Sequence, residues 1–261
     1  MELIRRKILL VALPMIFLGV LSLRGQSFRI LSMNMKEGGQ YAGYKAAPYA
    51  AFIKEYDPDF VCLQEVDMRT IRSKKTDILD SLAMQTGMFP FFCKSFDYQE
   101  GGFGVAILSK YPFYRVEKTV VTLDGAREPR GTAWVYVQLP DGSNVRVGSV
   151  HLAVESNDLA IKQWADVSKK VLLEKDIPTI LAGDFNCPPD GATISYVSIK
   201  WQEIARGSGP TIPSTGPTSQ LDYMMGYPKG GWKWSNYKII PRSDLSDHCF
   251  IVADLSYEAQ Q

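Results

Sequence analysis

Short apolar segments, separated by turn-forming residues, recur along most of this 261-residue chain and limit what it can fold into. Each segment has the length of a β-strand and is shorter than a typical helix. A Pro-Asp-Gly-Ser turn at 140–143 predicts a hairpin between two of them. The expected strands are 28–35, 59–66, 104–112, 132–140, 145–154, 177–185, 220–226 and 249–255.

Three longer segments predict helices, and they cover about 44–56, 75–86 and 157–174. In the last of these, apolar side chains from Leu159 to Leu172 recur near helical spacing, and Asn157 or Asp158 can cap the start. Most expected strands are apolar on both faces, and the helices alternate with them. The pattern predicts the α/β class, with two packed sheets and helices outside them, in one domain of residues 27–261.

The first 26 residues differ in composition from the rest. Arg5, Arg6 and Lys7 precede an uncharged apolar run of about 16 residues, from Ile8 to Leu23, and small and polar residues follow. This order is typical of a secretory signal peptide. The run is shorter than the ~20 residues that span a bilayer, so cleavage is favoured over a permanent membrane anchor or a buried helix. We expect export to the periplasm or the medium, with membrane anchoring if the segment stays uncleaved.

The charge of the mature chain limits its partners. Removing residues 1–26 takes away four basic residues and one acidic residue, which moves the formal net charge from +1 to −2. Tight non-specific binding of nucleic acid comes mainly from Lys and Arg, so no strongly basic binding surface is expected. A polyanionic substrate remains compatible if a bound metal supplies positive charge.

Polar residues of a particular kind stand at the ends of several expected strands. Each one alone has a structural explanation, but the chain has only two histidines and both occupy such positions. Strand ends at one edge of a layered sheet protein converge on one cleft, where ligands tend to bind. The residues are Asn34, Glu65, His151, Asp184, Asn186, Asp222, Asp247 and His248.

These residue types indicate the chemistry of a hard cation. Glu65, Asp247 and the side-chain oxygen of Asn34 are hard donors, and the chain has no thiolate cluster, so Mg²⁺, Mn²⁺ or Ca²⁺ is favoured over zinc. Mg²⁺ typically takes one or two carboxylates and leaves its other positions to water and phosphate. A metal beside an acid–histidine pair therefore predicts phosphoryl transfer.

Eight segments, in order, resemble the successive motifs of the endonuclease/exonuclease/phosphatase superfamily. This superfamily includes pancreatic-type deoxyribonucleases, abasic-site endonucleases, neutral sphingomyelinases and inositol-polyphosphate 5-phosphatases. The resemblance covers nearly the whole mature chain, and GDFN together with SDH and an upstream QE is its most specific part. It implies a four-layered α/β/β/α sandwich with the site at one edge. The segments are LSMNMKEG, VCLQEV, GVAILSKYP, REPRG, GSVHL, LAGDFNCPP, QLDYMM and LSDHCFIVADL.

The resemblance also implies roles for the metal ligands and for one histidine. Glu65 would be the principal carboxylate on the divalent metal, with Asn34 and Asp247 beside it. His248, held by Asp222, would act at the scissile phosphate. It would serve there as a general base or as a stabiliser of transition-state charge.

The remaining strand-end residues would handle the nucleophile and the phosphate. Asp184 would position or deprotonate the attacking water, and Asn186 would orient that water or a phosphate oxygen. His151 would donate to a non-bridging oxygen. Asn186 cannot titrate, which suits an orienting role.

Two arginines flank Glu128 in the stretch DGAREPRG. Either Arg127 or Arg130 can contact the substrate phosphate, or they can form a structural ion pair with Glu128. The chain also differs from the family pattern at two positions. Glu100 is only a loose positional candidate for the carboxylate partner of the first histidine, and Tyr98 is the nearest candidate for a site-lining tyrosine.

Four cysteines, Cys62, Cys93, Cys187 and Cys249, lack metal-type spacing. Cys62 lies in an apolar run and is expected to be a small buried hydrophobe, so free core thiols are favoured. Export would permit disulfides, and a pair between Cys187 and Cys249 is the one to test first because each lies near a predicted site residue.

Three functions follow as hypotheses. The first is an exported, Mg²⁺- or Mn²⁺-dependent phosphodiesterase that acts as a monomer, with DNA or RNA as the plainest substrate. The second is a hydrolase of small phosphoesters, such as inositol phosphates or a sphingomyelin-type headgroup. A binding protein that keeps only the fold is remote, because none of the expected site residues is missing. The Gly- and Pro-rich stretch 206–219 predicts an irregular loop that forms either a substrate-facing rim or a plain solvent loop.

Overall fold

The computed structural model describes residues 27–259 of the protein. The predicted signal peptide at 1–26 lies outside the described residues. Within 27–259, none of the helices has both the length and the apolar character needed to cross a bilayer.

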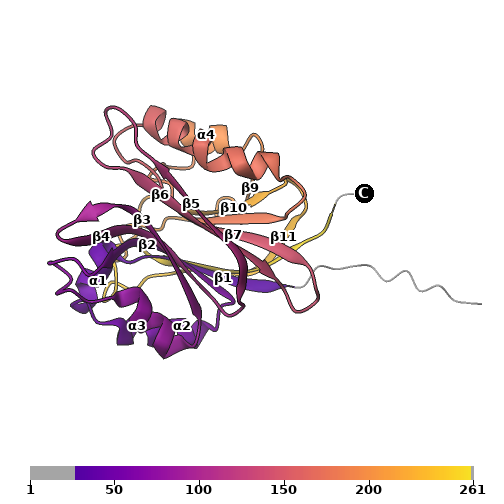
Figure 1. Ribbon diagram of the computed structural model, residues 1–261. Coiled ribbons are helices and arrows are strands. Elements are labelled where there is room, and N and C mark those ends of the chain that lie inside the picture. The colour runs from indigo at the N-terminus through magenta and orange to yellow at the C-terminus, as the bar shows by residue number, and fades with distance from the viewer. Residues whose placement is uncertain (1–26, 260–261) are drawn as a thin grey trace, which may run out of the picture.

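Two six-stranded sheets pack face to face, with helices on their outer sides (Figure 1). β1 and β2 are parallel, as are β7 and β8, and the other paired strands are antiparallel, so both sheets are mixed. The α/β sandwich predicted from the sequence is confirmed. The first sheet has the order β11 (Trp232–Ile240), β12 (Phe250–Tyr257), β1 (Phe28–Asn34), β2 (Phe60–Met68), β4 (Gly101–Ser109) and β3 (Phe89–Tyr98). The second has the order β5 (Phe113–Val121), β6 (Arg130–Gln138), β7 (Asn144–His151), β8 (Thr179–Asp184), β10 (Asp222–Tyr227) and β9 (Gln202–Glu203).

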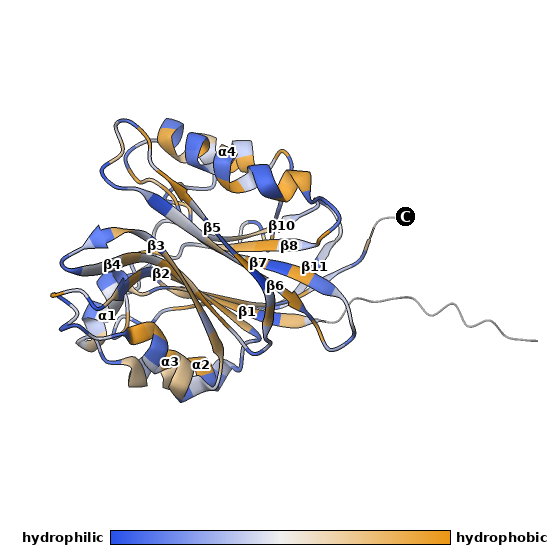
Figure 2. Cartoon of the chain, viewed as in Figure 1, coloured by the Kyte–Doolittle hydropathy of each residue, from blue (hydrophilic) through white to orange (hydrophobic). Residues whose placement is uncertain are grey.

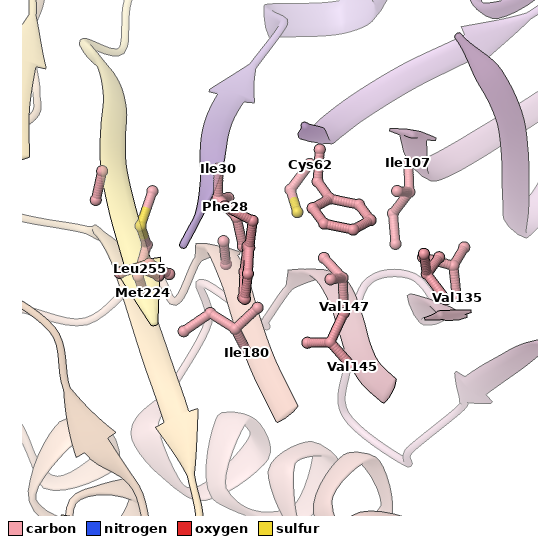
Figure 3. Close-up of a cluster of buried hydrophobic side chains, with 14 of the residues drawn as sticks. Phe28, Ile30, Cys62, Ile107, Val135, Val145, Val147, Ile180, Met224 and Leu255 are labelled. Carbon is pink, nitrogen blue, oxygen red and sulfur yellow. The ribbon is translucent and has the colours of Figure 1, made fainter. Parts of the chain in front are cut away.

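The main core fills the space between the two sheets (Figure 3). Side chains from both sheets meet there, because alternate residues of each strand point to the same face. The opposite faces of the central strands are covered by helices, which explains why these strands are buried on both faces. Labelled members of this core include Phe28, Ile30, Cys62, Ile107, Val135, Val147, Ile180 and Met224.

Helices cover both outer faces of the sandwich. α2 (Ala46–Tyr56) and α3 (Ile78–Thr86) pack on the first sheet, and α4 (Asn157–Leu173) and α5 (Ala192–Val197) pack on the second. Figure 2 shows apolar residues gathered on the strands and hydrophilic residues on the solvent side of α4. The predicted caps of α4 were wrong by one or two positions, because the side chain of Ser156 accepts the hydrogen bond from the Leu159 amide.

The eight predicted strands and the three predicted helices are present. The hairpin at 140–143 is confirmed, since the Leu139 amide donates to the Ser143 carbonyl over 2.8 Å. Four further strands, β3, β5, β9 and β11, were not predicted. Each lies at or next to a sheet edge and is partly exposed, so none carries a continuous apolar run.

All four cysteines are buried free thiols, as favoured by the sequence. The thiol of Cys187 lies 3.1 Å from the side-chain oxygen of Asn157 at the start of α4. The pair of Cys187 and Cys249 is therefore not a disulfide.

The register of three neighbouring strands sets the position of the predicted site. His151 at the end of β7 pairs with Asp184 at the end of β8, and Asp184 pairs with Asp222 at the start of β10. These three residues therefore form one row across the second sheet. The first sheet brings Asn34, at the end of β1, beside Gln64 of β2.

Gly183 allows β8 to approach β7 closely, just before Asp184. Its φ is 154°, and a Cβ there would collide with the carbonyl oxygen of Val150. We expect Gly183→Ala to lower the free energy of unfolding by about 2–4 kcal/mol, through strain and displacement of the strand. Urea denaturation would measure this as a lower midpoint with an unchanged m value.

The matched control for this prediction is Gly216→Ala. Gly216 is exposed, and a Cβ there would meet nothing within 4 Å. Equal stability of the two variants would contradict the close approach assigned to Gly183.

Candidate active site

A cleft of about 460 Å³ opens at the predicted strand ends. It lies at the end of the sandwich marked by the short helix α1 (Lys36–Gly39) in Figure 1. Asn34 and Asp222 are buried and contact residues that line the cleft, while Arg127 is exposed and does not line it. The predicted site residues that line the cleft are Glu65, Arg130, His151, Asp184, Asn186, Asp247 and His248.

Asp184 lies at the centre of this group. Its Oδ1 accepts the Asn186 amide at 2.8 Å, and its Oδ2 accepts the side-chain nitrogen of Asn34 at 3.1 Å. The same Oδ2 lies 3.6 Å from Nε2 of His151 and 3.7 Å from Nε2 of His248. Burial and the neighbouring carboxylate of Asp222 raise the pKa of Asp184 to about 7. A carboxylate with this pKa can take a proton near neutral pH.

His248 is held by a buried carboxylate. Its Nδ1 lies 2.9 Å from Oδ2 of Asp222, and that oxygen also accepts the hydroxyl of Thr211 at 2.6 Å. Burial opposes protonation, but Asp222 and then Asp184 raise the pKa of His248 to about 10. His248 is therefore a cation at neutral pH, which favours the role of charge stabiliser over that of general base.

His151 has a different electrostatic environment. Nη1 of Arg130 lies 3.0 Å from its Nδ1 and 3.2 Å from its Nε2. Burial, the charge of Arg130 and the charge of His248 hold the pKa of His151 well below its usual value. A neutral imidazole can still donate one N–H, so the predicted role of His151 at a phosphate oxygen stays a prediction.

Glu100, the positional candidate for the carboxylate partner of His151, does not contact this histidine. The side chain of Glu100 is 72% exposed and pairs with Lys75, outside the cleft. The nearest carboxylate to His151 is instead Asp184. Tyr98, the candidate for a site-lining tyrosine, does line the cleft.

Glu65 and Asn34 join the first sheet to the site. Glu65 has a φ of 53° at a bulge in β2, and Asn186 has a φ of 49°. Left-handed backbone at residues other than glycine is costly and is concentrated at functional sites. The side-chain nitrogen of Asn34 donates to Glu65 at 3.2 Å, and its oxygen accepts the amide of Lys36. Asn34 thus turns its nitrogen, not the predicted metal-binding oxygen, toward the carboxylates.

Glu65 and Asp247, the two carboxylates predicted to hold a metal, both interact with Lys36. The ammonium of Lys36 lies 3.1 Å from Asp247, and it is also close enough to Glu65 to interact with it electrostatically. Burial opposes its charge, yet these carboxylates raise the pKa of Lys36 above its usual value. A cation is therefore favoured beside these two hard donors, as a Mg²⁺ or Mn²⁺ site requires.

A second group with metal-ligating atoms consists of Asp184, Asp222 and His248, whose ligand atoms lie within 4.8 Å of one another. The facing atoms of Asp222 and His248 are already hydrogen-bonded to each other, and Asp222 is 3% exposed. Two members of this group, Asp222 and His248, are therefore already engaged with each other.

Several residues of the cleft were not found from the sequence. Lys36 and Glu37 enter through the left-handed backbone of α1, and Arg72 enters from a loop with no regular pattern. The loop 206–219 supplies Ile212 to the rim of the cleft and Thr211 to Asp222. That loop is therefore part of the site, in agreement with the first of the two alternatives.

A family model and curated proteins match this chain. The model of the Endonuclease/Exonuclease/phosphatase family matches residues 31–248. Among curated proteins, the uncharacterized protein YbhP of Escherichia coli strain K12 is 26% identical over 175 residues, which is 61% of this chain and 67% of that protein.

Solved structures share the fold. A functionally unknown conserved protein of Enterococcus faecalis V583 has a TM-score of 0.75 at 19% identity, over 88% of this chain and all of the other. The mannosyl-6-phosphatase Bt3783 of Bacteroides thetaiotaomicron VPI-5482 has a TM-score of 0.71 at 16% identity, over 87% of this chain and 99% of the other.

Proposed function

This chain belongs to the endonuclease/exonuclease/phosphatase family, whose members hydrolyse phosphoester bonds, and we propose that it does so with a divalent metal and Asp184 as the base. The observation that carries the proposal is that the buried side chains of Asp184 and His248 lie 3.7 Å apart and differ in how they hold a proton. The raised pKa of Asp184, about 7, suits a base, while that of His248, about 10, suits a lasting cation.

The side chains divide the reaction between them. Asp184 takes the proton of the attacking water while a P–O bond forms, and the ester P–O bond breaks on the opposite side. Asn186 orients the water. His248 and Arg130 face the charge that develops on the phosphoryl oxygens, and neutral His151 donates its N–H to one of them.

Glu65 and Asp247 would hold the metal, which would neutralise phosphate charge and assist the leaving oxygen. Asn34 orients Glu65 and Asp184 through its side-chain nitrogen. Members of the family typically use a divalent metal, and the hard carboxylates here favour Mg²⁺ or Mn²⁺.

Two substrate classes remain candidates. Nucleic acid is favoured by Tyr98 in the cleft, because bases stack on aromatic rings. Small phosphoesters are favoured by the shared fold with a mannosyl-6-phosphatase. A panel of plasmid DNA, RNA, bis-p-nitrophenyl phosphate, sphingomyelin and inositol phosphates would test the function, with and without Mg²⁺ or Mn²⁺. Inactivity on every phosphoester despite bound metal would contradict it.

The metal assignment predicts the effect of Glu65→Gln. Losing this carboxylate is expected to weaken Mn²⁺ binding by about 100-fold and to lower activity at limiting metal. Isothermal titration calorimetry measures the affinity directly, without substrate.

The control variant is Glu55→Gln, which changes an exposed carboxylate on α2. It should bind Mn²⁺ like the wild type. Unchanged affinity in Glu65→Gln would move the metal away from Glu65, for example to the group around Asp184.

A further inference from the structure

One wall of the cleft is built from three aromatic rings, those of Phe96, Tyr98 and Phe103. The ring centroids of Phe96 and Phe103 lie 5.3 Å apart, and Tyr98 lies 6.0 Å from the first and 6.4 Å from the second. Aromatic rings at such spacings form one apolar unit. Phe96 and Phe103 have no part in the hydrolysis described above, and Tyr98 entered it only as a stacking surface for a base.

A bulge in β3 aims these rings together. The register of β3 against β4 shifts between Lys94 and Phe96, after which Phe96 stands directly opposite Phe103. Tyr98 is two residues further along, on the same face of the strand. Bulges commonly re-aim side chains next to active sites.

Arg72 fixes the rings without offering a free charge. Its guanidinium carbon lies 4.7 Å from the ring centroid of Tyr98 and 5.5 Å from that of Phe103. Two hydrogen bonds, of 2.7 and 2.9 Å, join it to the buried carboxylate of Asp67, and Nη1 lies 3.0 Å from Glu37. Its positive charge is therefore already compensated.

The other lysine and arginine side chains that line the cleft are paired as well. Lys36 lies 3.1 Å from Asp247, and Arg130 lies 3.1 Å from Glu128. Glu37 and Glu128 both line the cleft. A substrate with several phosphates would need uncompensated basic residues, and its extra charges would meet these two carboxylates instead.

We propose that this wall is a subsite for an uncharged, hydroxyl-bearing ring and that the substrate carries a single phosphate, as in a sugar phosphate or a nucleoside monophosphate. The proposal rests on the proposed phosphoester hydrolysis. The rings stack on the flat face of a sugar or a nucleobase. Glu37 and Glu128 accept hydrogen bonds from hydroxyl groups and repel further phosphates.

The test compares four substrates in steady-state assays: a hexose 6-phosphate, adenosine 5′-monophosphate, glycerol 3-phosphate and inositol 1,4,5-trisphosphate. We expect kcat/KM for at least one ring monophosphate to exceed that for glycerol 3-phosphate and for the trisphosphate by about tenfold or more. Comparing the hexose 6-phosphate with adenosine 5′-monophosphate shows whether a sugar or a nucleobase stacks on the aromatic wall.

The variant Phe96→Ala should lower kcat/KM for the preferred ring substrate by about tenfold, mainly through KM, and so bring it close to the value for glycerol 3-phosphate. Phe96→Leu keeps most of the apolar volume but lacks the ring face, and it should show the same loss as Phe96→Ala. The loss can then be assigned to stacking and not to a failure to fold. The matched control, Phe89→Ala, removes a 45% exposed ring of the same strand that does not line the cleft. It should retain the ring preference.

Failure of this proposal is distinguishable from failure of the proposed function. A wild type without activity on any phosphoester overturns both. An active wild type that prefers the trisphosphate, glycerol 3-phosphate or plasmid DNA overturns only the subsite. The subsite is also overturned if Phe96→Ala and Phe96→Leu keep the wild-type preference for ring substrates.

Discussion

Asp184→Asn is expected to lower kcat by about 10³-fold, the largest loss for a single carboxylate in this protein. Asparagine keeps the shape and can still contact Asn34, but it cannot take a proton from water. Asp184 is 1% exposed and its pKa is raised to about 7, so it can accept that proton near neutral pH. Steady-state kinetics at saturating metal would measure the loss.

The pH profile adds a second readout for Asp184. A base must be ionised, so the wild-type rate should rise with pH through the pKa of this group, and the residual rate of Asp184→Asn should not. Asp190→Asn is the matched control, because Asp190 is exposed six residues further along the chain. A full rate in Asp184→Asn would remove this residue from the reaction.

His248→Ala is expected to lower kcat/KM by about 10³-fold, since it removes the lasting cation beside the phosphate. Asp222→Asn should cost about 10²-fold, because the imidazole stays but loses the carboxylate that raises its pKa. The two losses should not add in the double variant, since Asp222 acts through His248. A double-mutant cycle in kcat/KM measures this coupling.

The sign of the pH effect follows from the pKa of His248, which is about 10. The wild type keeps the cation up to that pH, whereas Asp222→Asn should lose activity at a lower pH as its histidine deprotonates. Asp244→Asn, at an exposed carboxylate paired with Arg242, serves as the control. Additive losses, or an unshifted pH profile in Asp222→Asn, would assign His248 a role that does not depend on its charge.

The parts of the fold that the sequence predicted are those with the most complete burial. β2 and β8 are covered on both faces, and their apolar runs, FVCL and TILA, can be read directly. β5 escaped prediction because it is an edge strand in which half-buried and exposed residues alternate, with Arg115 and Lys118 among them. Its strand character comes from pairing with β6, which the local sequence does not encode.

Some residues of the candidate site could be predicted from the sequence and others could not. Asp184 and His248 could be predicted, because each follows or precedes a strand that the pattern identifies. Lys36 and Arg72 could not, because the first depends on a φ of 45° and the second on a turn that brings it against the buried carboxylate of Asp67. Arg127 and Arg130 were equivalent in the sequence, and only the geometry separates the exposed side chain from the one against His151.

The row formed by His151, Asp184 and Asp222 has a consequence for the motions of the native protein. These three residues belong to the backbone ladders of β7, β8 and β10, so they cannot separate unless the sheet itself opens. Hydrogen exchange at Val150 and Gly183 should therefore proceed only through global unfolding. The reacting groups thus share the slowest fluctuations of the molecule.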